Sequence, residues 1–330
     1  MKKIVDYCER IYELEDCNLR LVDEHEGGRN IVFICSKNMV DKYVIRISQL
    51  ADREEEDYLA ELEFVHYLAQ KGASVSDVIL SKNGKMVECL ESGDKKFFIC
   101  LFEYAKGMLI SENGYKYCES HPITEYFYNT GKVLGKIHRL SKEYKPKHKR
   151  CDYFAKYNNE YINKLIPDKY LELKLAIKRR FEMFSFIPKD IDKYGLVHFD
   201  FSDGNYHIDM NTGEITVFDF DNSIYCWYMY DLANLWIHGV GWFQLENDMV
   251  KRKKYMDDYF AEVLNGYISE TNIDDFVLKK LPLFIDMVLI ENIVDCFECA
   301  IRSNTEIDDD DINDKAYCLI NDILYAGINS

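Results

Sequence analysis

The stretch that most constrains the fold is residues 196–221, which read LVHFDFSDGNYHIDMNTGEITVFDFD. Short apolar runs typical of β-strands alternate here with clusters of Asp, Asn, Ser and Gly, which favour turns. A carboxylate follows an apolar run at Asp200 and again at Asp219, and Asn205 lies between them. A merely buried sheet would have no use for these carboxylates. The stretch therefore predicts strands joined by a hairpin turn at residues 210–214, with polar side chains placed for chemistry.

The order of these polar residues matches the requirements of phosphoryl transfer. That reaction needs a carboxylate to orient a hydroxyl group and hard oxygen ligands to hold Mg²⁺ against nucleotide phosphates. Asp200 and Asn205 supply a base and a metal ligand from one loop, and Asp219 supplies a second ligand after the next strand. Each residue alone is as well explained by a turn or capping role. The ordered set favours the catalytic interpretation.

The rest of the chain divides into two kinds of segment. Residues 19–103 consist mainly of β-type apolar runs around one helical pattern at 52–72, which has an acidic first turn and ends at Gly72. After Gly107 the pattern changes to long helices, interrupted only by the stretch at 196–221. The sequence therefore predicts an α+β protein with a small β-rich lobe at 1–104 and a large, mainly helical lobe at 105–330.

The motif H-F-D-F-S-D-G-N at 198–205, followed by F-D-F-D at 218–221 and Y-D-L-A at 230–233, resembles the aminoglycoside phosphotransferase and choline kinase family. The resemblance covers roughly residues 20–240. It implies a bilobal protein-kinase-like fold, with a small β-rich N-lobe (1–104) that binds nucleotide and a large, mainly helical C-lobe (105–330) that carries out catalysis and binds substrate. It also implies an ATP-dependent phosphotransferase that uses Mg²⁺ and an alcohol group as acceptor, and it does not exclude GTP.

On the basis of this resemblance, Asp200 would face the acceptor hydroxyl, and Asn205 and Asp219 would bind Mg²⁺. His198 would brace the catalytic loop, and Asp231 would accept hydrogen bonds from the backbone around it. Two further residues remain open: Asp203 and Asp221 contact metal or substrate, or have a turn or surface role.

In the N-lobe, Arg46 lies in the strand KYVIRIS, where many relatives carry Lys. A guanidinium group binds phosphate oxygens in a bidentate manner. Glu61 shares a helix face with Tyr58, Val65 and Leu68, so this carboxylate on an apolar face is expected to pair with Arg46. Glu63 is the alternative partner if the helical phase differs by two residues.

The other nucleotide contacts are less marked in the sequence. Gly27 and Gly28 precede a strand and suit a turn over phosphates, although paired glycines also occur in hairpins that bind no ligand. Backbone groups of Glu103, Tyr104 and Ala105, at the predicted hinge, would bind the adenine base.

For the acceptor, Glu291, Asp295 and Glu298 recur on one face of a helical pattern. They form either a solvated stripe or a wall that receives a cationic group. Trp227, near the metal segment, and Asp203 are further candidates for substrate contact. These residues favour an amine-bearing acceptor, such as an aminoglycoside, a choline-like amine or a homoserine-like amino acid.

The bulk composition limits the alternatives. A net charge of −17 argues against binding to nucleic acid. The chain shows no signal peptide and no uncharged apolar run of about 18 residues, which predicts a cytoplasmic protein without a membrane span. The 11 cysteines are scattered and suggest small core residues in a reducing compartment. A nucleotide-binding pseudokinase that acts as a scaffold is the main alternative function, and the sequence leaves the oligomeric state open.

Overall fold

The computed structural model describes residues 2–22, 29–49, 53–119, 121–243 and 245–326 of the 330-residue chain. The chain forms two compact units. The first unit contains Met1–Glu119, Tyr144–Arg150 and Asp203–Asp221, and the second contains Ser120–Glu143, Cys151–Ser202 and Asn222–Ser330. A division into functional lobes at residue 104 remains a prediction. Within the described residues, no helix is long and apolar enough to cross a membrane.

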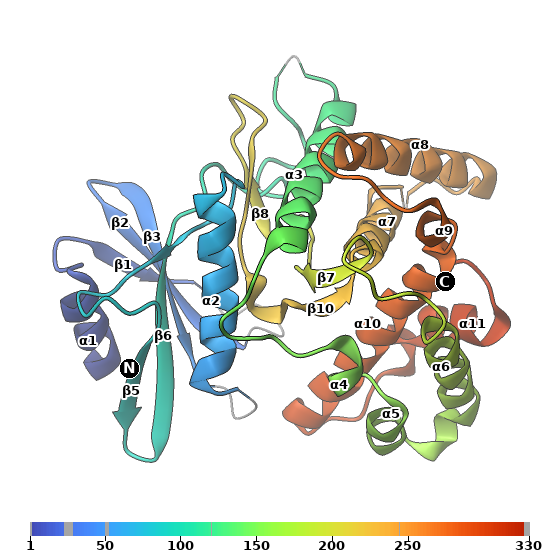
Figure 1. The fold of residues 1–330 in the computed structure, drawn as a ribbon, viewed down its shortest axis with the longest axis horizontal. Helices are drawn as coiled ribbons and strands as arrows, with labels where there is room; N and C mark the ends of the chain where they lie inside the picture. Colours follow the sequence, from blue (N-terminus) through green and yellow to red (C-terminus); the bar gives the residue numbers. More distant parts are fainter. Residues whose placement is uncertain (1, 23–28, 50–52, 120, 244, 327–330) are drawn as a thin grey trace. The chain divides into compact units, whose positions relative to one another are not determined.

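The first unit is built on a six-stranded antiparallel sheet in the order β1-β2-β3-β6-β4, with β5 also paired to β6. Helices α1 and α2 pack on its opposite faces, and β8 and β9 form a separate hairpin (Figure 1). The elements are α1 (Lys2–Tyr12), β1 (Asn18–Leu21), β2 (Asn30–Lys37), β3 (Val40–Ser48), α2 (Glu55–Gln70), β4 (Val78–Ile79), β5 (Glu88–Ser92), β6 (Lys95–Glu103), β8 (Tyr206–Ile208) and β9 (Ile215–Val217).

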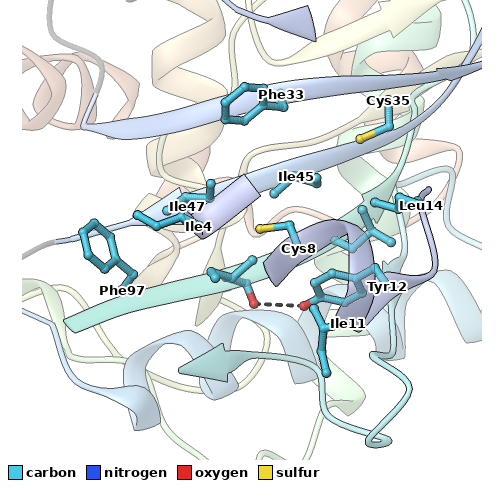
Figure 2. Packing of buried hydrophobic residues seen from close by; sticks show 12 residues of the cluster. Ile4, Cys8, Ile11, Tyr12, Leu14, Phe33, Cys35, Ile45, Ile47 and Phe97 are labelled. Atoms are coloured by element: carbon cyan, nitrogen blue, oxygen red, sulfur yellow. Dashed lines mark hydrogen bonds between the residues drawn. The ribbon is translucent and has the colours of Figure 1, made fainter. Parts of the chain in front are cut away.

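Strand β6 shows why this sheet needs a helix on each face. Successive side chains of a strand point to opposite faces, and nearly all of KKFFICLFE is apolar. Phe97 and Ile99 pack in the cluster under α1, whereas Phe98 and Cys100 pack in the cluster under α2. Figure 2 shows the first cluster, in which the Tyr12 hydroxyl donates a hydrogen bond to the carbonyl of Ile99 at 3.0 Å. The same alternation along β3 buries Ile45 and Ile47 in this cluster and turns Arg46 toward α2.

The second unit is mainly helical, and its two strands β7 and β10 pair in antiparallel fashion. Together with the sheet of the first unit, these helices confirm the α+β fold class expected from the sequence. Its elements are α3 (Ile123–Glu143), α4 (Tyr153–Lys156), α5 (Asn159–Leu165), α6 (Leu171–Phe184), β7 (Tyr194–Val197), β10 (Ile224–Trp227), α7 (Met229–Phe243), α8 (Met249–Ile268), α9 (Asp275–Leu278), α10 (Leu281–Ser303) and α11 (Asn313–Asn321).

Helices α3 and α8 approach each other closely because each carries a glycine at the contact. A Cβ atom at Gly131 would lie 1.8 Å from the carbonyl oxygen of Val263, and one at Gly266 would lie 1.9 Å from that of Tyr128. Any larger residue would force the helices apart. This close packing places α3 so that His138, near its C-terminal end, is completely buried.

Candidate active site

The first feature of the site is a buried ion pair between β3 and α2. Arg46 donates two hydrogen bonds to the Glu61 carboxylate, from Nη1 to Oε1 at 2.8 Å and from Nη2 to Oε2 at 2.7 Å. Arg46 is 5% exposed and Glu61 is 0% exposed. Burial acts to lower the pKa of Arg46, but the Glu61 carboxylate outweighs it and raises that pKa well above its usual range. The predicted pairing is confirmed. The alternative partner, Glu63, instead accepts a bond from the His148 ring at 2.8 Å.

The second feature is the β8–β9 hairpin, which brings the two predicted metal ligands to one end. Phe218 donates its N–H to the carbonyl of Asn205 at 2.9 Å, so Asn205 and Asp219 flank the open end of this hairpin. Asp219 adopts a left-handed backbone conformation, with φ of 61°. Its carboxylate lies 3.6 Å from Nη1 of Arg46 and remains 44% exposed. The carboxylate predicted to bind metal and the cation predicted to bind phosphate are thus neighbours within the first unit.

Asp221, two residues after Asp219, is held quite differently. Its carboxylate accepts a hydrogen bond from Nδ2 of Asn30 at 3.1 Å and lies 3.6 Å from Nη1 of Arg53. Asp221 is 6% exposed, and between it and Asp219 lies Phe220, which is 1% exposed. Burial acts to raise the pKa of Asp221, but the nearby arginines outweigh it and lower that pKa. A surface role for Asp221 is therefore excluded.

In the second unit, Asp231 organises the loop that carries Asp200. Its carboxylate accepts hydrogen bonds from the N–H groups of His198 and Phe199, both at 2.9 Å. Phe199 has φ of 73°, and its ring stacks on another aromatic ring at 4.3 Å. The N–H of Asp200 lies 3.3 Å from Nδ1 of His198. The expected bracing roles of Asp231 and His198 are confirmed, and the loop backbone is fixed on both sides of Phe199.

His138 completes this arrangement and was not found by the sequence analysis. Its Nε2 lies 3.0 Å from the Asp231 carboxylate, and its Nδ1 lies 3.0 Å from the Tyr267 hydroxyl. Burial lowers the pKa of His138, and this effect exceeds the opposite effect of Asp231. The neutral ring therefore bridges α3, α7 and α8 behind the loop. In the sequence, His138 lies among both apolar and charged residues of the helical pattern, so nothing there distinguishes it.

Glu291, an acidic residue of α10, has a pKa that the charge of Asp200 helps to raise. Burial, followed by the negative charges of Asp295 and Asp200, raises the pKa of Glu291 to about 8. Burial together with the charge of Glu291 in turn raises the pKa of Tyr157 and of Tyr230. Glu291 is therefore partly buried, near two buried tyrosine rings, and is affected by the charge of the predicted catalytic carboxylate.

The other two carboxylates of this helix face each have a cationic neighbour. Glu298 lies 3.0 Å from Nζ of Lys156, and Asp295, whose side chain is 58% exposed, lies 3.7 Å from a guanidinium nitrogen of Arg302. The structure also corrects the expectation that Trp227 contacts a substrate. Trp227 is 0% exposed, and its indole N–H donates to the carbonyl of Pro188 at 3.0 Å. Its ring is core, with no face left for stacking.

The predicted nucleotide contacts outside the Arg46 pair are only partly described. Gly27 and Gly28 lie outside the described residues. At the predicted hinge, the N–H groups of Glu103 and Tyr104 and the carbonyl of Ala105 already form hydrogen bonds within the fold. An adenine base would have to use the remaining backbone groups of this segment. Asp203 is partly buried in the turn before β8, and its role stays a prediction.

The donors around Asp219 suit a divalent metal that arrives with a nucleotide. Mg²⁺ is usually bound by one or two carboxylates and completes its coordination with phosphates and water. Asp219 and Asn205 offer such hard oxygen ligands. Within the described part of the chain, no group of three or more His, Cys, Asp or Glu residues forms a self-sufficient metal site. Nε of Arg46 is buried and has no hydrogen-bond partner among those residues.

Comparison with known proteins agrees with this geometry. The model of a family described as "Phosphotransferase enzyme family" matches residues 25–267. Amicoumacin kinase of Bacillus subtilis (strain 168) is 28% identical over 262 residues, which make up 78% of this chain and 74% of that protein. The match confirms the family resemblance and the phosphotransferase class expected from the sequence.

Solved structures confirm the fold. Amicoumacin kinase hAmiN in complex with AMP-PNP, Ca²⁺ and Ami superposes with a TM-score of 0.81 at 20% identity, over 99% of this chain and 95% of that one. A microcompartment-associated aminopropanol kinase superposes with a TM-score of 0.70 at 16% identity, over 97% of this chain and 94% of that one. The predicted fold, a small antiparallel sheet followed by a helical lobe, is therefore correct.

Proposed function

Since the chain belongs to the phosphotransferase enzyme family, we propose that it is a Mg²⁺-dependent kinase that transfers the γ-phosphate of ATP to a hydroxyl group of a small, amine-bearing acceptor. The observation that carries this proposal is the arrangement in the first unit. Glu61 holds the guanidinium of Arg46 in a bidentate pair, 3.6 Å from the Asp219 carboxylate. A fixed cation can bind the negative phosphates of a nucleoside triphosphate, and a carboxylate beside it can bind the metal ion that accompanies them.

The roles of the individual side chains follow from their chemistry. Arg46 would bind phosphate oxygens, and Glu61 would fix the orientation of its guanidinium. Asn205 and Asp219 would hold Mg²⁺, which neutralises phosphate charge when bound. Asp200 would accept the hydrogen bond of the acceptor hydroxyl and orient it toward the phosphate. Asp231 keeps the Asp200 loop in place through its bonds to the two preceding N–H groups.

Two substitutions test these assignments. Asp200→Asn should leave folding and Mg²⁺–nucleotide binding nearly intact but reduce turnover to less than about a tenth of wild type, a loss above ~1.4 kcal/mol. Asp219→Ala should instead abolish the dependence of nucleotide binding on Mg²⁺, measured by titration with a non-hydrolysable ATP analogue. Substantial turnover by Asp200→Asn, or an unchanged Mg²⁺ titration for Asp219→Ala, would contradict the corresponding role. A protein that binds nucleotide but phosphorylates none of the screened acceptors would favour the pseudokinase alternative.

The acceptor proposal rests on Glu291. In the free enzyme a pKa of about 8 keeps this carboxyl largely protonated at pH 7, because burial and the charges of Asp295 and Asp200 oppose its ionisation. Glu298 adds to that effect, and Lys156 opposes it. A protonated amine would offset the local negative charge and favour the ionised carboxylate. The proton lost by Glu291 would then pass to the solvent when the acceptor binds.

Proton release gives this proposal a direct measurement. Calorimetric titration of an amine-bearing acceptor at pH 7, in buffers of different ionisation enthalpy, should show release of a substantial fraction of one proton. Glu291→Gln should abolish the release and raise the acceptor KM without weakening nucleotide binding. Glu306→Gln, which removes one exposed charge elsewhere in the second unit, is the control. Identical proton release in wild type and Glu291→Gln, or a preferred acceptor without an amine, would refute this assignment. Amicoumacin belongs in the first screen because a relative is a kinase of that name.

A further inference from the structure

The D-F-D segment, residues 219–221, contains a second carboxylate, Asp221, which lies in a buried junction and has no role in the proposed chemistry. The Asp221 side chain accepts a hydrogen bond from Asn30, at the start of β2, and lies beside Arg53, just before α2. The side chains of Arg53 and Asp221 are only 9% and 8% exposed. A buried carboxylate with charged and hydrogen-bonded partners is strongly fixed in position, because each lost partner would leave a polar group unsatisfied. Asp221 therefore anchors the turn that carries Asp219.

The spacing of this anchor matches the spacing of β3. Arg46 and Ser48 are two residues apart, so they project from the same face of the strand. Arg46 lies beside Asp219. Ser48 donates to Oδ1 of Asn30 at 2.5 Å, and Nδ2 of Asn30 donates to Asp221 at 3.1 Å. Two parallel connections thus run from one strand to the D-F-D segment. One is direct and reaches the exposed carboxylate, and the other passes through Asn30 and reaches the buried one.

A third connection comes from the segment Tyr144–Arg150, which belongs to the first unit although its neighbours in the chain do not. The Arg150 guanidinium donates to the carbonyl of Asp57, in the first turn of α2, at 3.1 Å and to the carbonyl of Asp221 at 2.5 Å. The Tyr144 ring packs on α2, 5.1 Å from the ring of Phe64. Arg150 therefore links the D-F-D segment to the helix that carries Glu61.

We propose that Asp221 and Arg150 are positioning residues for metal binding. Together they hold the D-F-D segment against β3 and α2, so that the Asp219 carboxylate stays beside Arg46 in the geometry that receives the metal–nucleotide complex. Neither side chain contacts the metal in this proposal. It rests on the proposed function, because it assumes that Asp219 is a metal ligand. The two carboxylates of this segment then have separate roles: Asp219 binds the metal, and Asp221 holds the segment in place.

The test measures the Mg²⁺ concentration at the midpoint of binding of a non-hydrolysable ATP analogue, together with kcat and the KM for Mg²⁺. Asp221→Asn preserves size and one acceptor oxygen but removes the charge that faces Arg53. It should raise the Mg²⁺ midpoint by about tenfold or more, as loss of a residue that orients a metal ligand typically does. Saturating Mg²⁺ should restore most of kcat. Arg150→Ala should shift the midpoint in the same direction, and Lys149→Ala, an exposed neighbour, should not shift it.

The outcomes separate this proposal from the function on which it rests. If Asp219→Ala loses Mg²⁺ dependence while Asp221→Asn and Arg150→Ala titrate like wild type, the positioning roles are wrong and the proposed function stands. If Asp219→Ala keeps wild-type Mg²⁺ dependence, both proposals fail. A loss of kcat in Asp221→Asn that Mg²⁺ does not restore would show a purely structural role and also overturn the inference. Should Asp221→Asn fail to fold, the Arg150→Ala titration decides.

Discussion

The buried pair of Arg46 and Glu61 makes a quantitative prediction about both stability and binding. Glu61→Gln keeps the shape of the side chain but removes the charge that compensates a buried guanidinium. Breaking a buried ion pair by removing one partner typically destabilises a protein by about 3–5 kcal/mol. Here the Asp219 carboxylate, 3.6 Å away and partly exposed, is able to move closer to Arg46 and compensate in part. We therefore expect a loss near the lower end, about 3 kcal/mol.

That partial compensation should itself impair metal binding. A carboxylate drawn to Arg46 is less available to a metal, so Glu61→Gln should raise the Mg²⁺ midpoint for nucleotide binding by about tenfold. Replacing both members of the pair by apolar residues, Arg46→Met with Glu61→Leu, should recover most of the lost stability, because buried ion pairs are often no more stable than apolar replacements of similar volume. The double variant should nevertheless bind nucleotide poorly, since it lacks the cation that we propose binds phosphate.

The assay is equilibrium unfolding by denaturant, followed by nucleotide titration on the folded variants. Glu63→Gln is the matched control, because Glu63 lies two residues further along α2 and pairs with His148 at a partly exposed site. It should reduce the free energy of unfolding by only about 1 kcal/mol or less. Equal losses for Glu61→Gln and Glu63→Gln would refute the reasoning. So would a double variant as unstable as Glu61→Gln alone.

Three further predictions concern the second unit. Asp231→Ala should leave the buried N–H groups of His198 and Phe199 unsatisfied, lowering the free energy of unfolding by at least about 2 kcal/mol and accelerating hydrogen exchange at Phe199. The folded-state pKa of Glu291 is raised from 4.5 to about 8, so its contribution to stability is complete below 4.5 and is lost as pH rises through 8. Glu291→Gln should therefore flatten the decline in unfolding free energy between those values. Trp227→Phe should lower stability and leave the acceptor KM unchanged, because that ring is buried core.

The sequence predicted the pair of Arg46 and Glu61 because both of its signals are local. The family resemblance identified Arg46 in its strand, and helical phase placed Glu61 on the apolar side of α2, beside Tyr58 and Leu68. A buried carboxylate on that face required a cation, and β3 supplied one. The same kind of reasoning explains the hairpin, since its turn residues and flanking strands lie within 12 positions of one another.

The contacts that the sequence did not predict join residues far apart in the chain. Asn30 and Asp221 are separated by 191 positions, and Arg150 and Asp221 by 71. No periodicity connects such residues, because their meeting depends on how a strand edge, a helix and a connecting segment pack. Arg150 in particular ends a basic run that is typical of solvated loops.

The residue type alone did not show whether the ring of Trp227 is exposed or buried. On α10, helical spacing correctly placed Glu291, Asp295 and Glu298 on one face, but it did not show how their surroundings differ. The difference comes from neighbouring elements: Lys156 in α4 lies beside Glu298, and aromatic residues lie near Glu291. Only tertiary packing therefore separates the carboxyl with a strongly raised pKa from its two neighbours.

The backbone of the two segments proposed to be catalytic supports the division of roles among their carboxylates. Phe199 and Asp219 both adopt left-handed conformations, with φ of 73° and 61°, which cost most residues other than glycine about 1–2 kcal/mol, although Asp adopts them more readily than Phe. Strain of this kind persists only where the surroundings over-determine the backbone. In the second unit, Asp231 holds the N–H of Phe199, immediately before Asp200. In the first unit, the buried residues that follow Asp219 hold its turn. Glycine at either position would relieve the strain. At position 219 it would also remove the exposed carboxylate that the proposed chemistry needs.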